Sequence, residues 1–294
     1  PETATGAQTY DTFVNNVATR EPMVYIGAND GMLHAFHAPV ATCTGTVDTS
    51  GNCSAYTWPS TTNQGQEAFA FIPRAVYANL GNLTNNTAFQ FRPTVDSTPV
   101  TRDVYFSGDK KWHTLLTGGV GVGGRGIYAL DITDPSSFSA SNVLWEFDAD
   151  MLAPVTCVTN AEAPCRSTDL GYTVSQPNVG RLANGKWVVL VSNGYFPDCG
   201  TPDAPTGDVS TCNAIAAQVP KYTDGTNYSA LFVLDAETGK MLAELKTPKI
   251  SGVTSFGLAR AVLGDYTSDQ VDDVAFAGDV QGNLWRFDLS SSNP

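Results

Sequence analysis

The sequence predicts an all-β fold, a modified β-propeller of four-stranded blades with long loop insertions and few short helices. Three observations carry this prediction. Charged residues make up only 15% of the 294 residues, glycine (27) and proline (17) are plentiful, and one apolar strand–turn–strand pattern recurs along the chain. Scarce charge with abundant glycine and proline favours short strands and turns over long helices. The length fits one large all-β domain or two smaller ones.

The recurring pattern is an apolar strand, a turn that contains Gly or Asn, and a second apolar strand that usually ends near an Asp. It occurs in four segments: Met23–Ala38, Thr114–Thr133, Trp187–Tyr195 followed by Ala230–Gly239, and Asp273–Ser290. Glycine supplies positive φ angles at such turns, and the apolar side chains pack between neighbouring blades. The repeat of about 75 to 90 residues exceeds the ~40–50 residues of a propeller blade, and long loops account for the excess.

The remaining elements complete the blades. We expect inner strands over Thr94–Val100, Val174–Arg181 and Gly257–Leu263, and outer strands over Val143–Phe147 and Met241–Lys246. Apolar residues spaced along one side predict two helices, Gln8–Thr19 and Pro73–Leu83. Residues 1–22 are predicted to lead into one propeller domain over residues 23–294.

The six cysteines fall in three close pairs, each inside a polar insertion. Six thiols allow 15 pairings, so the sequence leaves the connectivity open. The clustering favours local disulfides, and the absence of a CxxC motif or a nearby histidine argues against zinc. The expected pairs are Cys43–Cys53, Cys157–Cys165 and Cys199–Cys212. Three such disulfides indicate an oxidising compartment: the periplasm, the cell surface or the medium.

The formal net charge of −13 bears on the partners of this chain. Nucleic-acid binding draws on basic patches, so the composition argues against a nucleic-acid partner. An acidic surface suits divalent cations instead. No apolar run approaches the length of a membrane-spanning helix, so no membrane-spanning segment is predicted.

The segment from Asp265 to Asp273 is the candidate metal site. Its oxygen donors alternate along a short loop before a predicted strand. They are Asp265, Thr267, Asp269, the backbone carbonyl of Val271, and Asp273. Ca²⁺ takes six to eight oxygen ligands, which such a loop can supply. The segment departs from the EF-hand pattern, because Gln270 replaces the Gly at position 6 and Phe276 replaces the Glu at position 12. An acidic turn that caps its own backbone is therefore the competing interpretation.

Several phrases of the sequence together resemble one family. YIGANDGMLHAF (25–36), EAFAFIP (67–73), GGVGVGGRGIYALD (118–131), GYTVSQP (171–177), SNGY (192–195) and AGDVQGNLWRFD (277–288) follow one another in the order found there. They resemble the C-terminal propeller of the PilY/PilC-type type IV pilus proteins. The resemblance runs from about residue 23 to residue 288, which is nearly the whole chain.

The resemblance implies a calcium-binding protein of a bacterial surface, exported through the periplasm and located at the pilus tip. It implies roles in pilus biogenesis, control of retraction, twitching motility and adhesion, with pilins and a host-cell or surface receptor as partners. The family's calcium loop corresponds to Asp265, Thr267, Asp269, Val271 and Asp273, with Thr267 where Asn or Asp is common. The family propeller continues beyond the LWRFD strand, so we expect here an incomplete propeller or one closed by chain that is not present.

Two alternatives to a pilus module remain at this stage. Quinoprotein dehydrogenases are propellers with phrases similar to LFVLDAETG (231–239), but the adjacent Cys-Cys pair frequent among them does not occur here. A non-catalytic scaffold propeller for envelope assembly is the second alternative, and the acidic loop and the clustered cysteines argue against it. The sequence also has no Gly-x-Ser-x-Gly nucleophile elbow. We therefore predict that the protein is not an enzyme.

Overall fold

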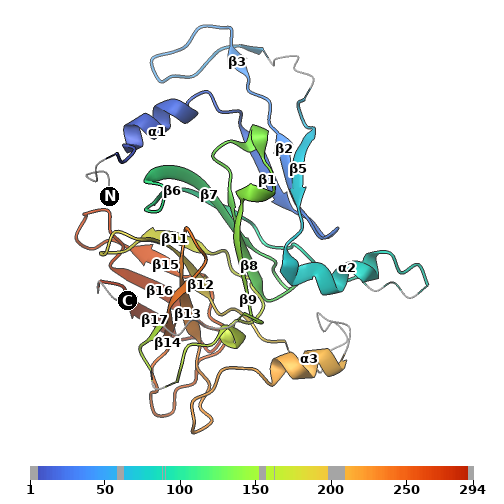
Figure 1. Cartoon of the computed structure of the whole chain (residues 1–294), viewed down its shortest axis with the longest axis vertical. Helices are drawn as coiled ribbons and strands as arrows, with labels where there is room; N and C mark the ends of the chain where they lie inside the picture. The colour runs from blue at the N-terminus through green and yellow to red at the C-terminus, as the bar shows by residue number, and fades with distance from the viewer. Residues whose placement is uncertain are drawn as a thin grey trace.

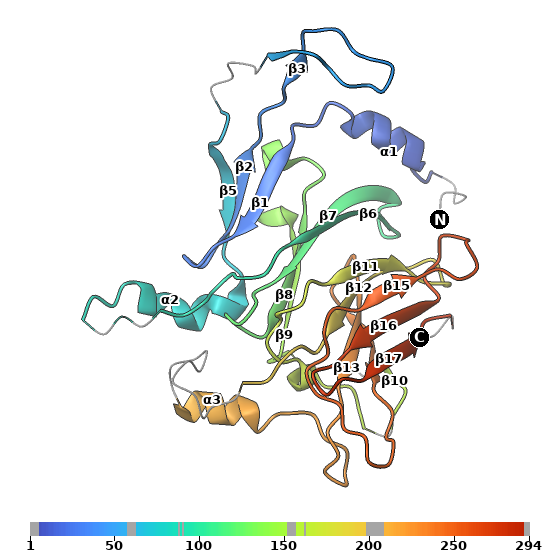
Figure 2. The same ribbon diagram turned by 180° about the vertical axis from the view of Figure 1, so that it is seen from behind.

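The computed structural model describes residues 6–57, 63–87, 89, 91–151, 157–161, 163–197 and 209–290, with the side chains of residues 209–211 excepted. Four mainly antiparallel sheets follow one another along the chain and stand in succession as blades (Figure 1). The view from behind shows the same succession, with the last sheet nearest the viewer (Figure 2). The fold is therefore mostly β and arranged as propeller blades, as the sequence predicts.

The blades differ in their numbers of strands. Blade 1 contains β1 (Met23–Gly27), β2 (Leu33–His37) and β5 (Glu67–Phe71), and blade 2 contains β6 (Val100–Phe106), β7 (Lys111–Gly119), β8 (Gly126–Asp131) and β9 (Val143–Asp148). Blade 3 runs β11 (Asn178–Arg181), β12 (Trp187–Ser192), β13 (Ala230–Asp235), β14 (Met241–Lys246) and β10 (Val158–Thr159), and blade 4 runs β15 (Val262–Gly264), β16 (Val274–Gly278) and β17 (Leu284–Asp288). Among the described residues, only blade 2 has the predicted four strands.

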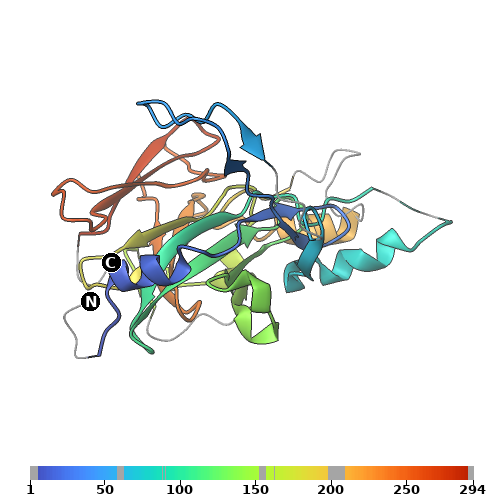
Figure 3. The same ribbon diagram turned by 90° about the horizontal axis from the view of Figure 1, so that it is seen from above.

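Short elements connect and cover the blades. The helices are α1 (Tyr10–Val17), α2 (Tyr77–Leu83) and α3 (Val209–Ala216), the 3-10 helices are η1 (Arg74–Val76), η2 (Pro135–Ser137), η3 (Ala140–Asn142) and η4 (Ser167–Asp169), and β3 (Thr42–Cys43) pairs with β4 (Tyr56–Thr57). Both predicted helices are present, and α2 projects from the sheets (Figure 3). None of the helices in the described segments is both long and apolar enough to span a membrane.

The four predicted hairpins and both outer strands are confirmed, whereas the inner strands begin later than predicted. The β6 strand starts at Val100, where the predicted strand Thr94–Val100 ends, and β11 and β15 occupy only the last residues of their predicted ranges. The segments before these strands do not pair along a sheet. They cross the end of the first hairpin strand of the preceding blade and bond to the main chain there, which uses backbone groups that a longer strand would need.

These crossings join each blade to the next through backbone hydrogen bonds. Val95 donates its N–H to the carbonyl of Ala28 over 3.3 Å, where the chain enters blade 2. Gly121 of blade 2 donates to Thr173 over 3.2 Å, where the chain enters blade 3. Gly194 of blade 3 forms a β-bridge with Leu258, at the entry to blade 4. The same kind of main-chain contact therefore occurs at all three blade junctions.

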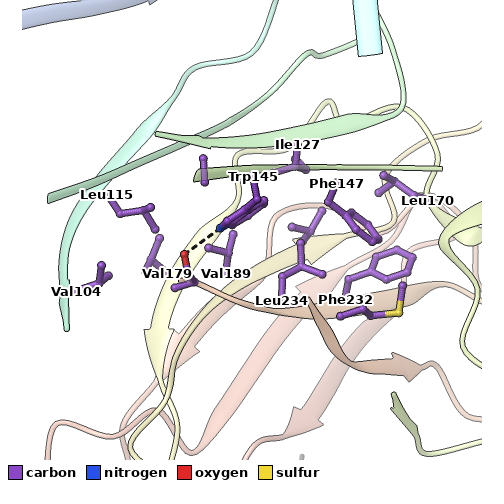
Figure 4. Close-up of a cluster of buried hydrophobic side chains, with 14 of the residues drawn as sticks. Val104, Leu115, Ile127, Trp145, Phe147, Leu170, Val179, Val189, Phe232 and Leu234 are labelled. Atoms are coloured by element: carbon purple, nitrogen blue, oxygen red, sulfur yellow. Dashed lines mark hydrogen bonds between the residues drawn. The ribbon is translucent and has the colours of Figure 1, made fainter. Parts of the chain in front are cut away.

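Three apolar cores fill the spaces between the blades. The central core packs Ile127, Trp145 and Phe147 of blade 2 against Val189 and Phe232 of blade 3 (Figure 4). The Trp145 indole N–H also donates to the carbonyl of Ala236 over 2.9 Å, which ties the two blades together at this core. Equivalent cores lie between blades 1 and 2 and between blades 3 and 4. Burial of apolar side chains between sheets is the main source of stability in such an arrangement.

Two of the three predicted disulfides are present, Cys43–Cys53 and Cys157–Cys165. Cys212 is also disulfide-bonded, while Cys199 lies outside the described residues. The Cys157–Cys165 loop contributes β10, which pairs in parallel with β14 and extends blade 3 to five strands.

A buried lysine fixes this loop to blade 3. The Lys246 side chain is fully buried, and its ammonium donates to the carbonyls of Ala163 (3.1 Å) and Pro164 (2.6 Å). The ammonium also lies 3.4 Å from a carboxylate oxygen of Glu244. A buried ammonium is tolerated only where several acceptors surround it, and here two of them come from the loop itself.

All three histidines of the chain lie against carboxylates. The pairs are His34 with Asp30 and Glu67, His37 with Glu21, and His113 with Asp109 and Asp131. Burial acts to lower the pKa of His113. The hydrogen bonds and charges of Asp131 and Asp109 outweigh it, so that pKa is raised above its ordinary value of 6.5.

The blade junctions make a prediction about two glycines. Gly194 and Gly225 both have positive φ angles, but a Cβ on Gly194 would collide with the carbonyl of Tyr172, whereas a Cβ on Gly225 meets no atom within 4 Å. We expect Gly225→Ala to lower the free energy of unfolding by about 1–2 kcal/mol through backbone strain alone. Gly194→Ala should cost roughly 1–3 kcal/mol more through overpacking. Denaturant unfolding measures both losses, and equal losses would contradict the close approach at this junction.

The His113 pairing predicts a pH dependence of stability. Because the folded-state pKa is raised, the contribution of His113 is fully present below its ordinary value of 6.5 and is lost as the pH rises through the raised pKa. We expect the free energy of unfolding to fall as the pH rises above about 6.5, and His113→Gln to reduce the slope. Urea unfolding at several pH values measures this pH dependence. The same slope in wild type and His113→Gln would show that this pair does not titrate as described.

Candidate functional site

The predicted metal loop connects β15 to β16 and folds around two of its own carboxylates. Asp265 accepts hydrogen bonds from the backbone N–H groups of Ser268 (2.6 Å) and Gln270 (2.8 Å). Asp273 accepts from the N–H groups of Tyr266 (2.8 Å) and Thr267 (3.2 Å). The first and last carboxylates of the loop are therefore each held by backbone donors from the residues between them.

The backbone of the loop takes the curvature that the alternating pattern predicts. Ser268 and Gln270 have φ angles of 59° and 65°, in the left-handed region that non-glycine residues rarely adopt. The Thr267 hydroxyl lies 3.5 Å from an Asp265 oxygen and 3.4 Å from an Asp273 oxygen. Three of the five predicted donors are thus brought together: Asp265, Thr267 and Asp273.

The other predicted donors are less converged. An Asp269 oxygen accepts from the N–H of Val271 over 3.0 Å, which is a local turn contact. Among the residues that the structure places, no group of three or more His, Cys, Asp or Glu side chains is arranged to hold a metal ion. The loop therefore shows both features weighed from the sequence: it gathers oxygen donors, and its carboxylates cap its own backbone.

The surroundings of Asp265 favour its ionised carboxylate. Partial desolvation acts to raise the pKa of Asp265, but hydrogen bonds from the N–H groups of Gln270, Ser268 and Asp269 outweigh it, and that pKa is lowered. An ionised carboxylate is the form that binds a hard cation. The donor set of carboxylates, a hydroxyl and a carbonyl thus fits Ca²⁺ in its chemistry.

One residue beside the donors was missed from the sequence. Asp272 lies outside the alternation, and the structure pairs it with β11 of blade 3. Its N–H donates to the carbonyl of Arg181 (2.8 Å), and its carboxylate accepts from the N–H of Arg181 (2.9 Å). The sequence holds one signal of this contact. Gly180 interrupts the predicted strand before Arg181, and an isolated glycine in a strand often marks a close approach by another segment.

Comparisons with known proteins identify the family. The family described as PilY1 β-propeller domain matches residues 2–294. The type IV pilus biogenesis factor PilY1 of Pseudomonas aeruginosa strain PAO1 is 38% identical over 284 residues, which is 95% of this chain and 18% of that protein. A PilY1 homolog of Xylella fastidiosa, also named a type IV pilus biogenesis factor, is 31% identical over 291 residues, covering 98% of this chain and 18% of that protein.

A solved structure agrees with these matches. The crystal structure of the Pseudomonas aeruginosa PilY1 C-terminal domain aligns with a TM-score of 0.59 at 37% identity, covering 96% of this chain and 41% of that chain. The present chain thus spans less than a fifth of the length of the curated relatives that it matches. The match extends over nearly all of the chain in sequence and in structure, and this chain belongs to the PilY1 β-propeller domain family.

Proposed function

We propose that this domain acts in type IV pilus biogenesis as a non-enzymatic module whose state responds to Ca²⁺. The observation that carries the pilus role is the match to proteins named type IV pilus biogenesis factors over 95% of the chain. The bacterial surface, at the pilus tip, is the proposed location, and pilins are the proposed partners. Retraction control, twitching motility and adhesion to a surface or host-cell receptor belong to the same proposal.

The calcium part of the proposal rests on the charge and the hydrogen bonds of the Asp265–Asp273 loop. Asp265, Asp269, Asp272 and Asp273 place four carboxylates in nine residues, and like charges so close repel one another. Backbone N–H groups already offset part of this repulsion at Asp265 and Asp273. A bound cation would offset the rest and draw Asp269 and the Val271 carbonyl toward the other donors.

The quinoprotein-like phrase supports a structural role. Within LFVLDAETG, the Asp235 carboxylate accepts from the N–H groups of Glu237 and Thr238, each over 3.1 Å. It also forms an ion pair with Lys186 over 3.0 Å. This aspartate therefore caps the turn between β13 and β14, and its partners account for it without a catalytic function.

The first test is calorimetric titration of the metal-stripped domain with Ca²⁺ and with Mg²⁺. We expect saturable binding that favours Ca²⁺, and Asp273→Ala should weaken it roughly tenfold or more, a loss of at least about 1.4 kcal/mol. Asp288→Ala is the matched control, because Asp288 is an exposed aspartate of the same blade whose carboxylate bonds Ser290 outside the loop. Unchanged affinity in Asp273→Ala would remove the loop from the proposal.

The second test concerns the pilus role in cells. We expect cells whose parent protein carries Asp265→Ala with Asp273→Ala to export the protein and yet lose calcium-dependent control of surface pili. Counts of surface pili and the width of the twitching zone, each with and without added Ca²⁺, measure the effect. If deletion of the whole domain leaves both readouts at wild-type levels, the pilus role is wrong.

A further inference from the structure

The Asp265–Asp273 loop of blade 4 is fastened to blade 3 through one residue. Asp272 and Arg181 exchange two hydrogen bonds, from the Asp272 N–H to the Arg181 carbonyl and from the Arg181 N–H to the Asp272 carboxylate. The contact joins two segments 91 residues apart in the sequence. Because Asp272 directly precedes Asp273, any displacement of the Asp273 carboxylate changes the position of this contact.

The fit of Asp272 on blade 3 is close. A Cβ on Gly180 would lie 2.7 Å from an Asp272 carboxylate oxygen and 2.7 Å from a methyl group of Leu263, so a larger residue would have to displace one of these side chains. The carboxylate therefore rests directly on the backbone of β11. The bond from the Asp272 N–H to the Arg181 carbonyl joins main chain to main chain, so motion of the loop acts on the strand itself.

From β11 the contact continues to blade 2. The carbonyl of Val179, two residues before Arg181, accepts a hydrogen bond from the Arg102 guanidinium of β6. The positive charge of Arg102 also acts on the Asp272 carboxylate. Its guanidinium lies 5.3 Å from the ring centre of Trp187, and Trp187 pairs with Arg181 in the register of β11 and β12. Arg102 thus contacts both β11 and Trp187.

Trp187 stands beside a cavity between blades 2 and 3. The cavity has a volume of about 440 Å³, and its lining includes Tyr105, Lys186, Trp187 and Glu237. Trp187 also meets the ring of Trp112 edge-on, with 5.7 Å between the ring centres. A small shift of β11 relative to β6 changes the surroundings of this indole and the shape of the cavity.

We propose that Asp272 is the residue through which cation occupancy of the Asp265–Asp273 loop alters the contact between blades 2 and 3 at Arg102 and Trp187. The inference rests on the proposed calcium function and adds a positioning residue to it. Without the cation, repulsion among neighbouring carboxylates loosens the loop and weakens the two hydrogen bonds to Arg181. With the cation, the loop is ordered, the bonds shorten, and β11 is held against Arg102.

The test follows tryptophan fluorescence and calorimetry during Ca²⁺ titration of the whole domain. The wild type should bind Ca²⁺ and change its fluorescence, and Trp187→Phe should bind Ca²⁺ with that change lost. Asp272→Ala should still bind Ca²⁺ by calorimetry but lose the fluorescence change. Asp272→Asn keeps an oxygen that accepts from the Arg181 N–H, so it should retain the change, and Asp288→Ala should behave as the wild type.

The outcomes separate this inference from the calcium proposal. No Ca²⁺ binding by the wild type would overturn both. Binding with a full fluorescence change in Asp272→Ala, or in Trp187→Phe, would overturn the role of Asp272 and leave the loop as a metal site. Hydrogen exchange at the Arg181 N–H of the wild type needs no substitution. We expect slower exchange with Ca²⁺, and an unchanged rate would also overturn the inference.

Discussion

The close approach of main chains at the blade junctions is the constraint on which the other features of this fold depend. A Cβ on Gly27 would lie 2.6 Å from the carbonyl of Val95, and one on Gly119 would lie 2.7 Å from the carbonyl of Thr173. Glycine at these positions lets the entering segment bond to the preceding blade. The apolar side chains of the three inter-blade cores are buried between blades that stand this close. The recurring glycine of the sequence is thus a mark of contact between repeats as much as of turns within them.

Charge is distributed so that most buried ionisable groups have partners. Burial, together with the nearby Asp169 charge, raises the pKa of Glu244, while burial lowers the pKa of Lys246. The neighbouring Asp169 carboxylate contacts Arg166 and accepts a hydrogen bond from the Tyr228 hydroxyl. The exposed loop between β15 and β16 is the contrasting case. Its carboxylates lie close together along the chain, and those of Asp265 and Asp273 accept hydrogen bonds chiefly from backbone N–H groups, which is the arrangement that a cation can change most.

The elements that depend on a short-range residue pattern could be predicted from the sequence. Those that depend on contacts between distant segments could not. Hairpins such as β7–β8, with their alternating apolar residues and turn glycines, could be placed because both strands carry the signal locally. The start of β6 could not be placed in this way. Thr94 and Val95 are residue types typical of a strand, but this segment bonds to blade 1 instead. The loop donors Asp265 and Asp273 could be found from spacing, whereas the partner of Asp272 lies 91 residues away. Likewise, no residue near Lys246 in the sequence indicates that its ammonium donates to carbonyls of the Cys157–Cys165 loop.

The local disulfides have a consequence for the order of events during folding. The joined cysteines are only 10 residues apart in Cys43–Cys53 and 8 residues apart in Cys157–Cys165. Closing such short loops costs little chain entropy, and it requires no contact between blades. Under oxidising conditions each of these two disulfides can therefore form before later blades have folded. At these two loops, oxidation is thereby uncoupled from the docking of one blade on the next.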